Sequence, residues 1–472
     1  MRITMRLLLA VLMTAASLQV AGPAAAVEGC AGPASGGDWF TRGGDLSGRR
    51  FQPAETTIGV KEAATLEPAW TFPIGGVSAT PVVADGCVYF VAGGNVVKLN
   101  ADSGELLWNV PAQAGASVTY DAGRVFANVN IPGGVGMVAI DADSGDIAWS
   151  TPVDDQYHVT VTGSPVAWNG MVITGFAAGL QELESGPQRT IMRGGYAILD
   201  QQTGAVIHKA HTIPDDDFAH GYAGGGLWST PAVDPETGHA YFGTGNPYSA
   251  REHPHTNAII KIDVDRQRST FGKIVGSYKG IPDLYLANVT YKPACEQTHL
   301  MPHCEPLDID FGGSANLWKD SRGRTIVGDL QKAGVYHAVN TADMNGVWMA
   351  TISYPAMFGN SGTAAVDDKG VYATVSYGAM WGLDSQNGAV KWATPGGNGW
   401  ASVNSVANGV VYEADTGVFR AVDRETGIPV LTRPLAQDTG RPSTTGLDAG
   451  VAIARNTIYV NASDALIAYR PA

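Results

Sequence analysis

The 472-residue sequence is poor in charge, in cysteine and in long apolar stretches, and each shortage excludes a class of protein. Only 16% of the residues are charged, and no helical periodicity extends beyond about ten residues, which argues against a helical fold. The apolar run over residues 7–20 is too short to serve as a transmembrane anchor. The sequence contains no Cys-x-x-Cys-His motif, so no covalently attached haem is expected.

What the sequence has in abundance is glycine, 60 residues of it, placed between short segments in which polar and apolar residues alternate. Alternating segments of this length are typical of β-strands, and glycine is typical of the tight turns that join them. The stretch 66–472 is too long for one ordinary hydrophobic core, which favours a repeated β architecture.

A turn motif recurs along the chain and sets the length of the repeat. Each unit is a strand, then Asp-x-x-Ser/Thr-Gly or a close variant, then a second strand, as around Asp141–Gly145. Gly104 and Gly145 lie 41 positions apart, and Gly388 and Gly427 lie 39 positions apart. Repeats of this length are typical of solenoids and propellers. A tryptophan after the turn, such as Trp108, provides an apolar plate that packs against the next unit.

The number of blades follows from the strand pairs that this turn joins. They occur near residues 98–108, 139–149, 197–208, 260–272, 337–348, 381–392 and 419–431. The segment 66–72 has no preceding partner and 465–469 has no following one, so their pairing closes a ring and hides both edges. The prediction is an all-β, eight-bladed β-propeller. A seven-bladed ring is the alternative, because the units near residues 260 and 340 are degenerate.

The N-terminal residues predict export. Arg2 and Arg6 precede the apolar run, and the alanines at 24–26 offer a small-residue cleavage site. We expect three parts: a secretory signal peptide over 1–26, an N-terminal arm over 27–65 and the propeller domain over 66–472. Cleavage takes the net charge from −14 to about −16, and so acidic a protein does not bind nucleic acid through phosphate contacts. The protein is expected to be secreted, either extracellular or periplasmic, without a transmembrane anchor.

Four cysteines in an exported chain favour two disulfides. Proximity pairs Cys295 with Cys304, which leaves Cys30 with Cys87 to tether the N-terminal arm. Zinc is the alternative at Cys295 and Cys304, because two histidines lie between them. Lipidation of Cys30 is a further alternative.

Four segments, in order along the chain, together resemble the pyrroloquinoline quinone (PQQ) dependent alcohol dehydrogenases, a family that includes the methanol and polyvinyl alcohol dehydrogenases. The most specific of them places a tryptophan, Trp228, eighteen positions before the asparagine of a Gly-Thr-Gly-Asn turn, Asn246. The other three are similar to the family's entry strand and to two motifs of the polyvinyl alcohol branch; they cover residues 45–70, 307–313 and 328–338.

The resemblance implies PQQ and calcium as cofactors. PQQ is a flat tri-anion, and Trp228 is expected to stack beneath it. Calcium prefers carboxylate and amide oxygens, and the implied ligands are Asn246, Asp310 and Glu182. Glu184 is the alternative to Glu182, because the alignment of this loop slips by two residues.

The resemblance also implies roles for the groups around the cofactor. Asp310 is the candidate general base, which accepts the alcohol proton while hydride moves to the quinone. Asp308 either supports it or is itself the base. Lys332 stabilises the quinone oxygen, and Thr162 contacts a PQQ carboxylate. Relatives that use lanthanides carry a further carboxylate where this chain has Gly312, which favours calcium.

Two features depart from the family pattern. The adjacent cysteines of the methanol branch are missing, and the stretch 115–120, where an arginine would bind a PQQ carboxylate, is neutral. Arg193 is the candidate to compensate. Each implied site residue also has a structural explanation: tryptophans pack between blades, asparagines cap turns, and lysines and aspartates lie on exposed loops.

Two functions from different classes remain. The first is a secreted quinoprotein alcohol dehydrogenase, whose substrate is an alcohol, with polymeric and secondary alcohols as candidates, and whose electrons pass to a separate cytochrome or quinone. The second is a cofactor-free propeller that acts as a binding or assembly scaffold. The joint presence of the Gly-Thr-Gly-Asn and Asp-x-Asp-Phe-Gly elements favours the enzyme. A zinc hydrolase is a distant third; it would use His253, His255, His299 and His303, of which the first pair is interpreted as surface residues.

Overall fold

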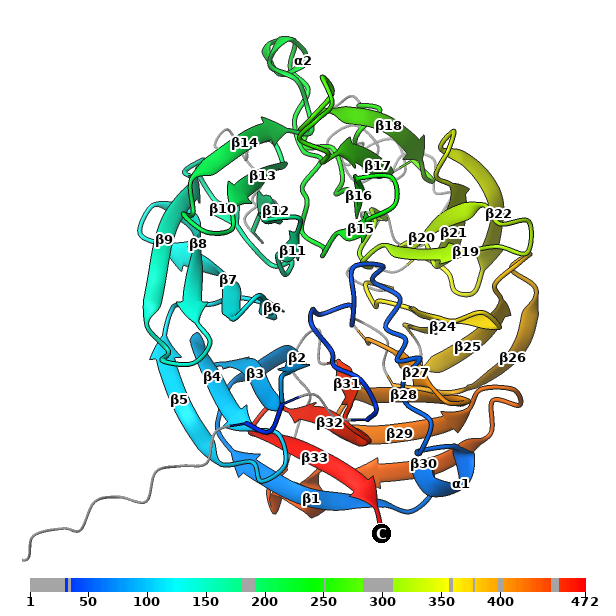
Figure 1. Ribbon diagram of the computed structural model, residues 1–472. Helices are drawn as coiled ribbons and strands as arrows, with labels where there is room; N and C mark the ends of the chain where they lie inside the picture. Colours follow the sequence, from blue (N-terminus) through cyan, green and yellow to red (C-terminus); the bar gives the residue numbers. More distant parts are fainter. Residues whose placement is uncertain are drawn as a thin grey trace, which may run out of the picture.

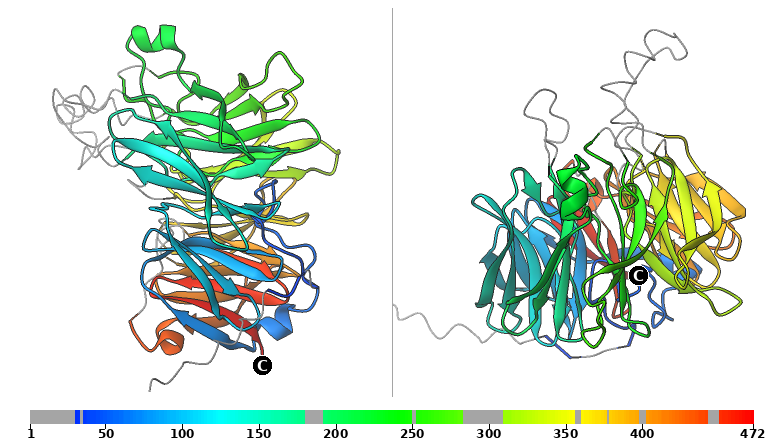
Figure 2. Two further views of the ribbon diagram at one scale, coloured as in Figure 1. Left: turned by 60° about the vertical axis from the view of Figure 1, so that its left-hand side comes forward. Right: turned by 90° about the horizontal axis from the view of Figure 1, so that it is seen from above.

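The computed structural model describes residues 30–32, 35–179, 192–249, 252–282, 309–355, 360–376, 378–397, 402–442 and 450–472. They form a ring of eight antiparallel sheets around a central axis (Figure 1). Within each blade the strands are stacked from the axis to the rim (Figure 1), and seen from the side the ring is a short cylinder (Figure 2). The predicted eight-bladed propeller is therefore confirmed, and the seven-bladed alternative is wrong.

The blades are numbered here in chain order. Within each blade, the strands are given from the innermost to the outermost. Blade 1 contains β2 (Val77–Ala84), β3 (Cys87–Ala92), β4 (Asn95–Asn100) and β5 (Leu106–Pro111). Blade 2 contains β6 (Thr119–Asp121), β7 (Arg124–Ile131), β8 (Gly134–Asp141) and β9 (Ile147–Asp154). Blade 3 contains β10 (Val159–Thr160), β11 (Val166–Trp168), β12 (Met171–Ala178), β13 (Gly195–Asp200) and β14 (Val206–His211).

Blades 4 to 7 have four strands each, in the same order as blades 1 and 2, whereas blade 3 has a fifth because β10 and β11 both pair with β12. Blade 4 contains β15 (Ala232–Asp234), β16 (His239–Gly243), β17 (Ala258–Asp263) and β18 (Ile274–Lys279), and blade 5 contains β19 (Asn316–Lys319), β20 (Thr325–Gln331), β21 (Val335–Asn340) and β22 (Asn345–Thr351). Blade 6 contains β23 (Ala365–Val366), β24 (Gly370–Val375), β25 (Ala379–Asp384) and β26 (Val390–Pro395). Blade 7 contains β27 (Ser405–Ala407), β28 (Val410–Asp415), β29 (Val418–Asp423) and β30 (Pro429–Pro434).

Blade 8 closes the ring with both ends of the chain. It contains β31 (Val451–Ala454), β32 (Thr457–Ala462) and β33 (Ala465–Pro471), and its outer strand is β1 (Leu66–Pro73). β1 pairs antiparallel with β33 from Leu66 opposite Pro471 to Pro73 opposite Ala465. This is the predicted pairing of the terminal strands, and it leaves neither strand as a free edge.

Among the described residues, three short helices lie outside the blades. They are α1 (Val60–Ala63), α2 (Asp215–Ala219) and α4 (Ala436–Thr439), and α2 projects from the rim between blades 3 and 4 (Figure 1). Within the described ranges, no helix is long and apolar enough to cross a membrane.

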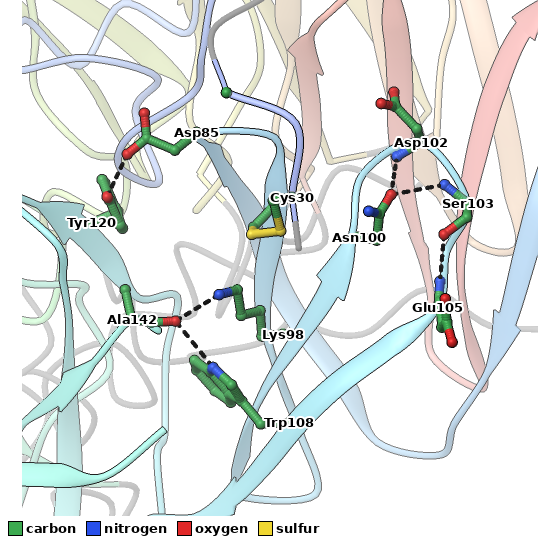
Figure 3. The surroundings of a disulfide bond; sticks show 12 residues. Cys30, Asp85, Lys98, Asn100, Asp102, Ser103, Glu105, Trp108, Tyr120 and Ala142 are labelled. Carbon is green, nitrogen blue, oxygen red and sulfur yellow. Dashed lines mark hydrogen bonds between the residues drawn. A yellow bond between two sulfur atoms is a disulfide. The ribbon is translucent and has the colours of Figure 1, made fainter. Parts of the chain in front are cut away.

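The recurring turn is stabilised by hydrogen bonds within it, and it packs against a tryptophan of the preceding blade. In blade 1 the Asn100 side chain accepts hydrogen bonds from the backbone of Asp102 (2.9 Å) and Ser103 (3.1 Å) (Figure 3). Gly104 follows with φ +73°, and a side chain there would collide with the Trp70 ring. Glycine is thus required both by the backbone conformation and by the docked tryptophan.

The tryptophan after the turn packs against the next blade, as predicted. Trp108 lies on Gly145, and its Nε1 donates a hydrogen bond to Ala142 O (3.1 Å) (Figure 3). The same contact recurs between other blades, in the pairs Trp149 on Gly204, Trp348 on Gly388 and Trp392 on Gly427. Blade 3 has His208 at this position, and its ring packs on Gly272.

The N-terminal arm lies over the axis of the ring and binds the inner strands (Figure 1). Backbone hydrogen bonds join it to blades 1, 2, 4, 5, 6, 7 and 8, through the pairs Trp39–Val83, Phe40–Tyr120, Leu46–Val233, Ser47–Leu317, Arg49–Val366, Arg50–Val406 and Gly37–Arg455. Because these hydrogen bonds reach seven of the eight blades, the arm cross-links blades that are distant from one another in the sequence.

A disulfide between Cys30 and Cys87 ties the start of the arm to β3 (Figure 3). The predicted pairing of these two cysteines is confirmed. It also removes the lipidation alternative for Cys30 in this state, because the sulfur is already bonded. Cys295 and Cys304 lie outside the described residues.

Candidate active site

Two glycine-rich segments of blade 4 bring Trp228 and Asn246 together. The Gly-Thr-Gly-Asn turn follows β16, and Gly245 N donates to Gly226 O (2.7 Å). In return Gly225 N donates to Asn246 O (3.0 Å). Only a residue without a side chain fits at Gly226, where a Cβ would lie 2.8 Å from the Ala177 Cβ. The eighteen-residue spacing seen in the sequence is therefore the length of chain needed to bring the segment of Asn246 back beside the segment that carries Trp228.

The segment around Asp310 is held between blades 4 and 5. Phe311 N donates to Thr244 O (3.3 Å), and Lys332 N donates to Asp310 O (2.8 Å). Since Thr244 belongs to the Gly-Thr-Gly-Asn turn and Lys332 follows β20, these bonds fix Asp310 at the junction of the two motifs.

The side chains of four predicted site residues meet at this junction. Lys332 Nζ forms an ion pair with Asp310 Oδ1 (2.8 Å). Asp310 Oδ2 accepts hydrogen bonds from Trp228 Nε1 (3.2 Å) and from Asn246 N (3.3 Å). Lys332 Nζ also lies 4.7 Å from the centre of the Trp228 ring, within range of a cation–π contact.

Burial gives this cluster its chemical character. The side chains of Asp310 and Lys332 are only 4% and 7% exposed, whereas Trp228 is half-buried. The cluster thus combines a held carboxylate, an ammonium group beside it and an aromatic surface that solvent reaches. A carboxylate so placed can accept a proton, the ammonium can stabilise a developing negative charge, and the ring can stack on a flat ligand.

Asn246 offers an amide to whatever binds beside Asp310. Its residue is 1% exposed, and its Nδ2 has no hydrogen-bond partner among the described residues. Because the amide oxygen and nitrogen exchange places by a flip of the group, this atom position also suits an oxygen that faces a cation. Asp310 and Asn246 therefore fit two of the three expected calcium ligands; Glu182, its alternative Glu184 and the supporting Asp308 lie outside the described residues. In the part of the chain that the structure describes, no group of three or more His, Cys, Asp or Glu side chains is arranged so that it could hold a metal ion.

Thr162 and Arg193, the other two residues expected to contact the cofactor, form hydrogen bonds within the protein. Thr162 is exposed, and its Oγ1 donates to Trp228 O (2.7 Å), so it supports the loop that carries the tryptophan. Arg193 Nη1 binds Asp215 Oδ1 (2.6 Å) and Ile213 O (2.9 Å), and its guanidinium packs on Phe218. The charge of Arg193 is therefore directed to the α2 region rather than to Trp228.

His253 is buried, so the interpretation of it as a surface residue is wrong, whereas His255 is partly exposed. His253 is 6% exposed, and its Nε2 lies 3.2 Å from Asp217 Oδ2. His255 Nδ1 lies 2.6 Å from Thr212 O, and burial lowers its pKa. These contacts connect the α2 region to blade 4, so the two histidines have a structural role there. His299 and His303 lie outside the described residues.

The structure adds a residue that the sequence did not single out. Asp329 of β20 is fully buried, and its Oδ1 accepts a hydrogen bond from Leu330 N (2.8 Å). Its two oxygens fill the space at Gly243 and Gly313, where a side chain would collide with them. Asp329 thus packs between the turns that carry Asn246 and Asp310. Burial raises its pKa to about 8.

Asp329 leads to a prediction for stability against pH. The folded protein keeps this proton up to about pH 8, whereas the unfolded chain releases it near pH 4, so stability falls between these values as pH rises. The neutral variant Asp329→Asn lacks this loss. Between pH 5 and pH 9, the free energy of unfolding of the variant, measured by urea titration, should rise relative to that of the wild type by about 4 kcal/mol. Parallel pH profiles for both proteins would contradict the assignment.

The fold and the site define an eight-bladed β-propeller with a buried carboxylate–ammonium pair beside a tryptophan. A family model described as "Outer membrane protein assembly factor BamB", that of the PQQ_2 repeats, matches residues 54–289, half of the chain. The chain belongs to this family of PQQ-type propeller repeats.

Named relatives are alcohol dehydrogenases. The chain is 27% identical to the polyvinylalcohol dehydrogenase of Sphingopyxis sp. (strain 113P3) over 360 residues, 65% of this chain and 53% of that protein. It is 25% identical to the polyvinylalcohol dehydrogenase of a Pseudomonas species over 396 residues, 76% of this chain and 59% of that protein. The chain thus matches little more than half the length of these relatives.

A solved structure confirms the architecture. The quinohemoprotein alcohol dehydrogenase ADHIIG from Pseudomonas putida HK5 superposes with a TM-score of 0.72 at 17% identity, over 93% of this chain and 80% of that one. At this identity the likeness shows the fold alone.

Proposed function

We propose that this chain is an exported quinoprotein alcohol dehydrogenase that oxidises an alcohol to a carbonyl compound, with PQQ and calcium as cofactors. The observation that supports it most directly is the meeting of Asp310, Lys332, Trp228 and Asn246 in one cluster. The names of the relatives favour secondary and polymeric alcohols as substrates. Bound PQQ would supply the hydride acceptor, and a separate cytochrome or quinone would take up the electrons.

The residues have distinct roles in this proposal. Trp228 would hold the flat cofactor by stacking, and Asn246 with Asp310 would supply oxygen ligands to calcium. Asp310 would take the hydroxyl proton of the substrate, assisted by the fixed position that Trp228 Nε1 and the Asn246 backbone give its Oδ2. Lys332, which lies beside Asp310 and over the Trp228 ring, would stabilise the negative charge that develops on the reduced quinone. The acidic, disulfide-linked chain suits an extracellular or periplasmic location.

A cofactor-free scaffold is the second candidate, because the matching family model carries the description of an assembly factor. A scaffold needs the repeating turns and the docked tryptophans, but it has no need of a buried Asp310–Lys332 pair beside a half-exposed Trp228. Burying such a pair costs desolvation energy, which a binding role elsewhere on the ring would not return.

The test is a titration of the mature protein with PQQ in the presence and absence of calcium chloride. We expect stoichiometric quenching of tryptophan fluorescence with calcium, weaker binding without it, and dye reduction with at least one of primary, secondary and polymeric alcohols. Trp149→Phe serves as the matched control, because Trp149 packs between blades and should not report the ligand. If PQQ fails to bind at micromolar concentration with calcium present, the scaffold is the better account.

A further inference from the structure

The N-terminal arm carries an arginine into the ring beneath the candidate active site. Arg42 is 5% exposed, and its Nη1 donates hydrogen bonds to the hydroxyls of Ser314 and Thr230. Ser314 follows Asp310 by four residues, and Thr230 follows Trp228 by two. Arg42 therefore bridges the two segments that present the carboxylate and the aromatic ring.

Thr230 and Ser314 are oriented to accept these bonds. Ser314 Oγ accepts a hydrogen bond from Thr230 N (3.2 Å), and Thr230 Oγ1 accepts one from Ser164 N (2.9 Å). Backbone N–H groups of blades 3 and 4 thus already bind the two hydroxyl oxygens. A second layer of hydrogen bonds, centred on Arg42, consequently lies below the layer in which Trp228 meets Asp310.

Arg42 brings a permanent positive charge to this layer, since a guanidinium does not lose its proton in proteins. Asp329 responds to this charge, which opposes the effect of burial on its pKa. Burial nevertheless dominates, and Asp329 keeps its proton at neutral pH, so this carboxyl does not cancel the charge of Arg42 there. A fully buried second arginine of the arm, Arg50, binds the Arg42 carbonyl and Asn404 O (2.7 Å), which fixes the arm in the ring.

We propose that Arg42 is a binding determinant for a flat, anionic ligand on Trp228, and that its charge replaces the cationic contact missing from the neutral stretch 115–120. This inference rests on the proposed function, in which that ligand is PQQ. Two extended residues separate Thr230 from Trp228 by at most about 7 Å between Cα atoms. For a guanidinium about 10 Å from a ligand carboxylate, at an effective dielectric constant of about 20, removal of the Arg42 charge changes the affinity on the order of tenfold for each negative charge on the ligand.

The test compares PQQ with its neutral trimethyl ester on four proteins: the wild type, Arg42→Met, Arg42→Lys and Arg455→Gln. We expect Arg42→Met to raise the Kd for PQQ tenfold or more and to leave the Kd for the ester within about threefold. Arg42→Lys, which keeps the charge, should stay within about threefold for both ligands. Arg455→Gln is the matched control, because Arg455 binds the arm at Gly32 O (2.6 Å), in blade 8; it should change neither Kd.

The possible results separate this inference from the proposed function. If the wild type binds PQQ and Arg42→Met binds it equally well, the inference is wrong and the proposed function stands. If Arg42→Met weakens PQQ and the ester alike, Arg42 acts by shape and the electrostatic role is wrong. If the wild type binds neither ligand, the proposed function and this inference fail together.

Discussion

Asp310→Asn should lower kcat for alcohol oxidation by about 10²–10⁴-fold while PQQ still binds. The variant keeps the shape of the side chain and an oxygen that accepts the Trp228 Nε1 hydrogen bond, but it loses the charge and the ability to take a proton. Turnover with a saturating alcohol and an artificial dye measures kcat, and fluorescence quenching measures binding.

Loss of the carboxylate also leaves the buried Lys332 ammonium without the Asp310 ion pair. Breaking a buried pair in this way costs about 3 kcal/mol, whereas removing both charges is much less costly. The double variant Asp310→Asn, Lys332→Met should therefore recover most of the stability and none of the turnover. Should the double variant regain activity as well, the loss in the single variant is due to unfolding, and Asp310 is not the base.

The architecture could be predicted because its information is local. Each turn carries its own Asp or Asn, its own glycine and its own tryptophan, as Asn100, Gly104 and Trp108 do, and the spacing of these units gives the number of blades. Closure of the ring followed from two strands that each lacked a partner, and the Cys30–Cys87 disulfide followed by elimination.

The site was only partly accessible in the same way. Trp228 and Asn246 lie on one blade, so their spacing in the sequence reflects a local fold. Arg42 meets Thr230 and Ser314 across 188 and 272 residues of sequence, and no local pattern contains such a contact. Asp329 lay within a motif that the sequence did show, but its burial depends on Gly243 of another blade.

For Arg193, the sequence suggested a contact with the ligand, whereas the structure shows contacts within the protein. Its position after the long loop made it a candidate ligand for an anion, yet the guanidinium binds Asp215 and packs on Phe218. A charged side chain with a nearby carboxylate and an aromatic face satisfies itself locally, and sequence position alone does not reveal this. The distribution of cations around Trp228 therefore had to come from the structure.

Trp228 should separate binding from catalysis when it is replaced in two ways. Trp228→Ala removes the aromatic surface and should raise the Kd for PQQ on the order of 50-fold, about 2–3 kcal/mol of lost stacking and apolar contact. Trp228→Phe keeps a flat ring but lacks the Nε1 donor to Asp310. It should bind PQQ within about fivefold of the wild type and lose on the order of tenfold in kcat, because one hydrogen bond to a charged group is lost.

Trp392→Ala is the matched control for this pair. Trp392 packs on Gly427 at the junction of blades 6 and 7, and its Nε1 donates to Arg424 O (2.8 Å). Its loss leaves a cavity between blades and should lower the free energy of unfolding by about 3 kcal/mol with no change in Kd. If Trp228→Ala instead resembles Trp392→Ala, with lower stability and unchanged PQQ binding, Trp228 is a packing residue and the ligand does not stack on it.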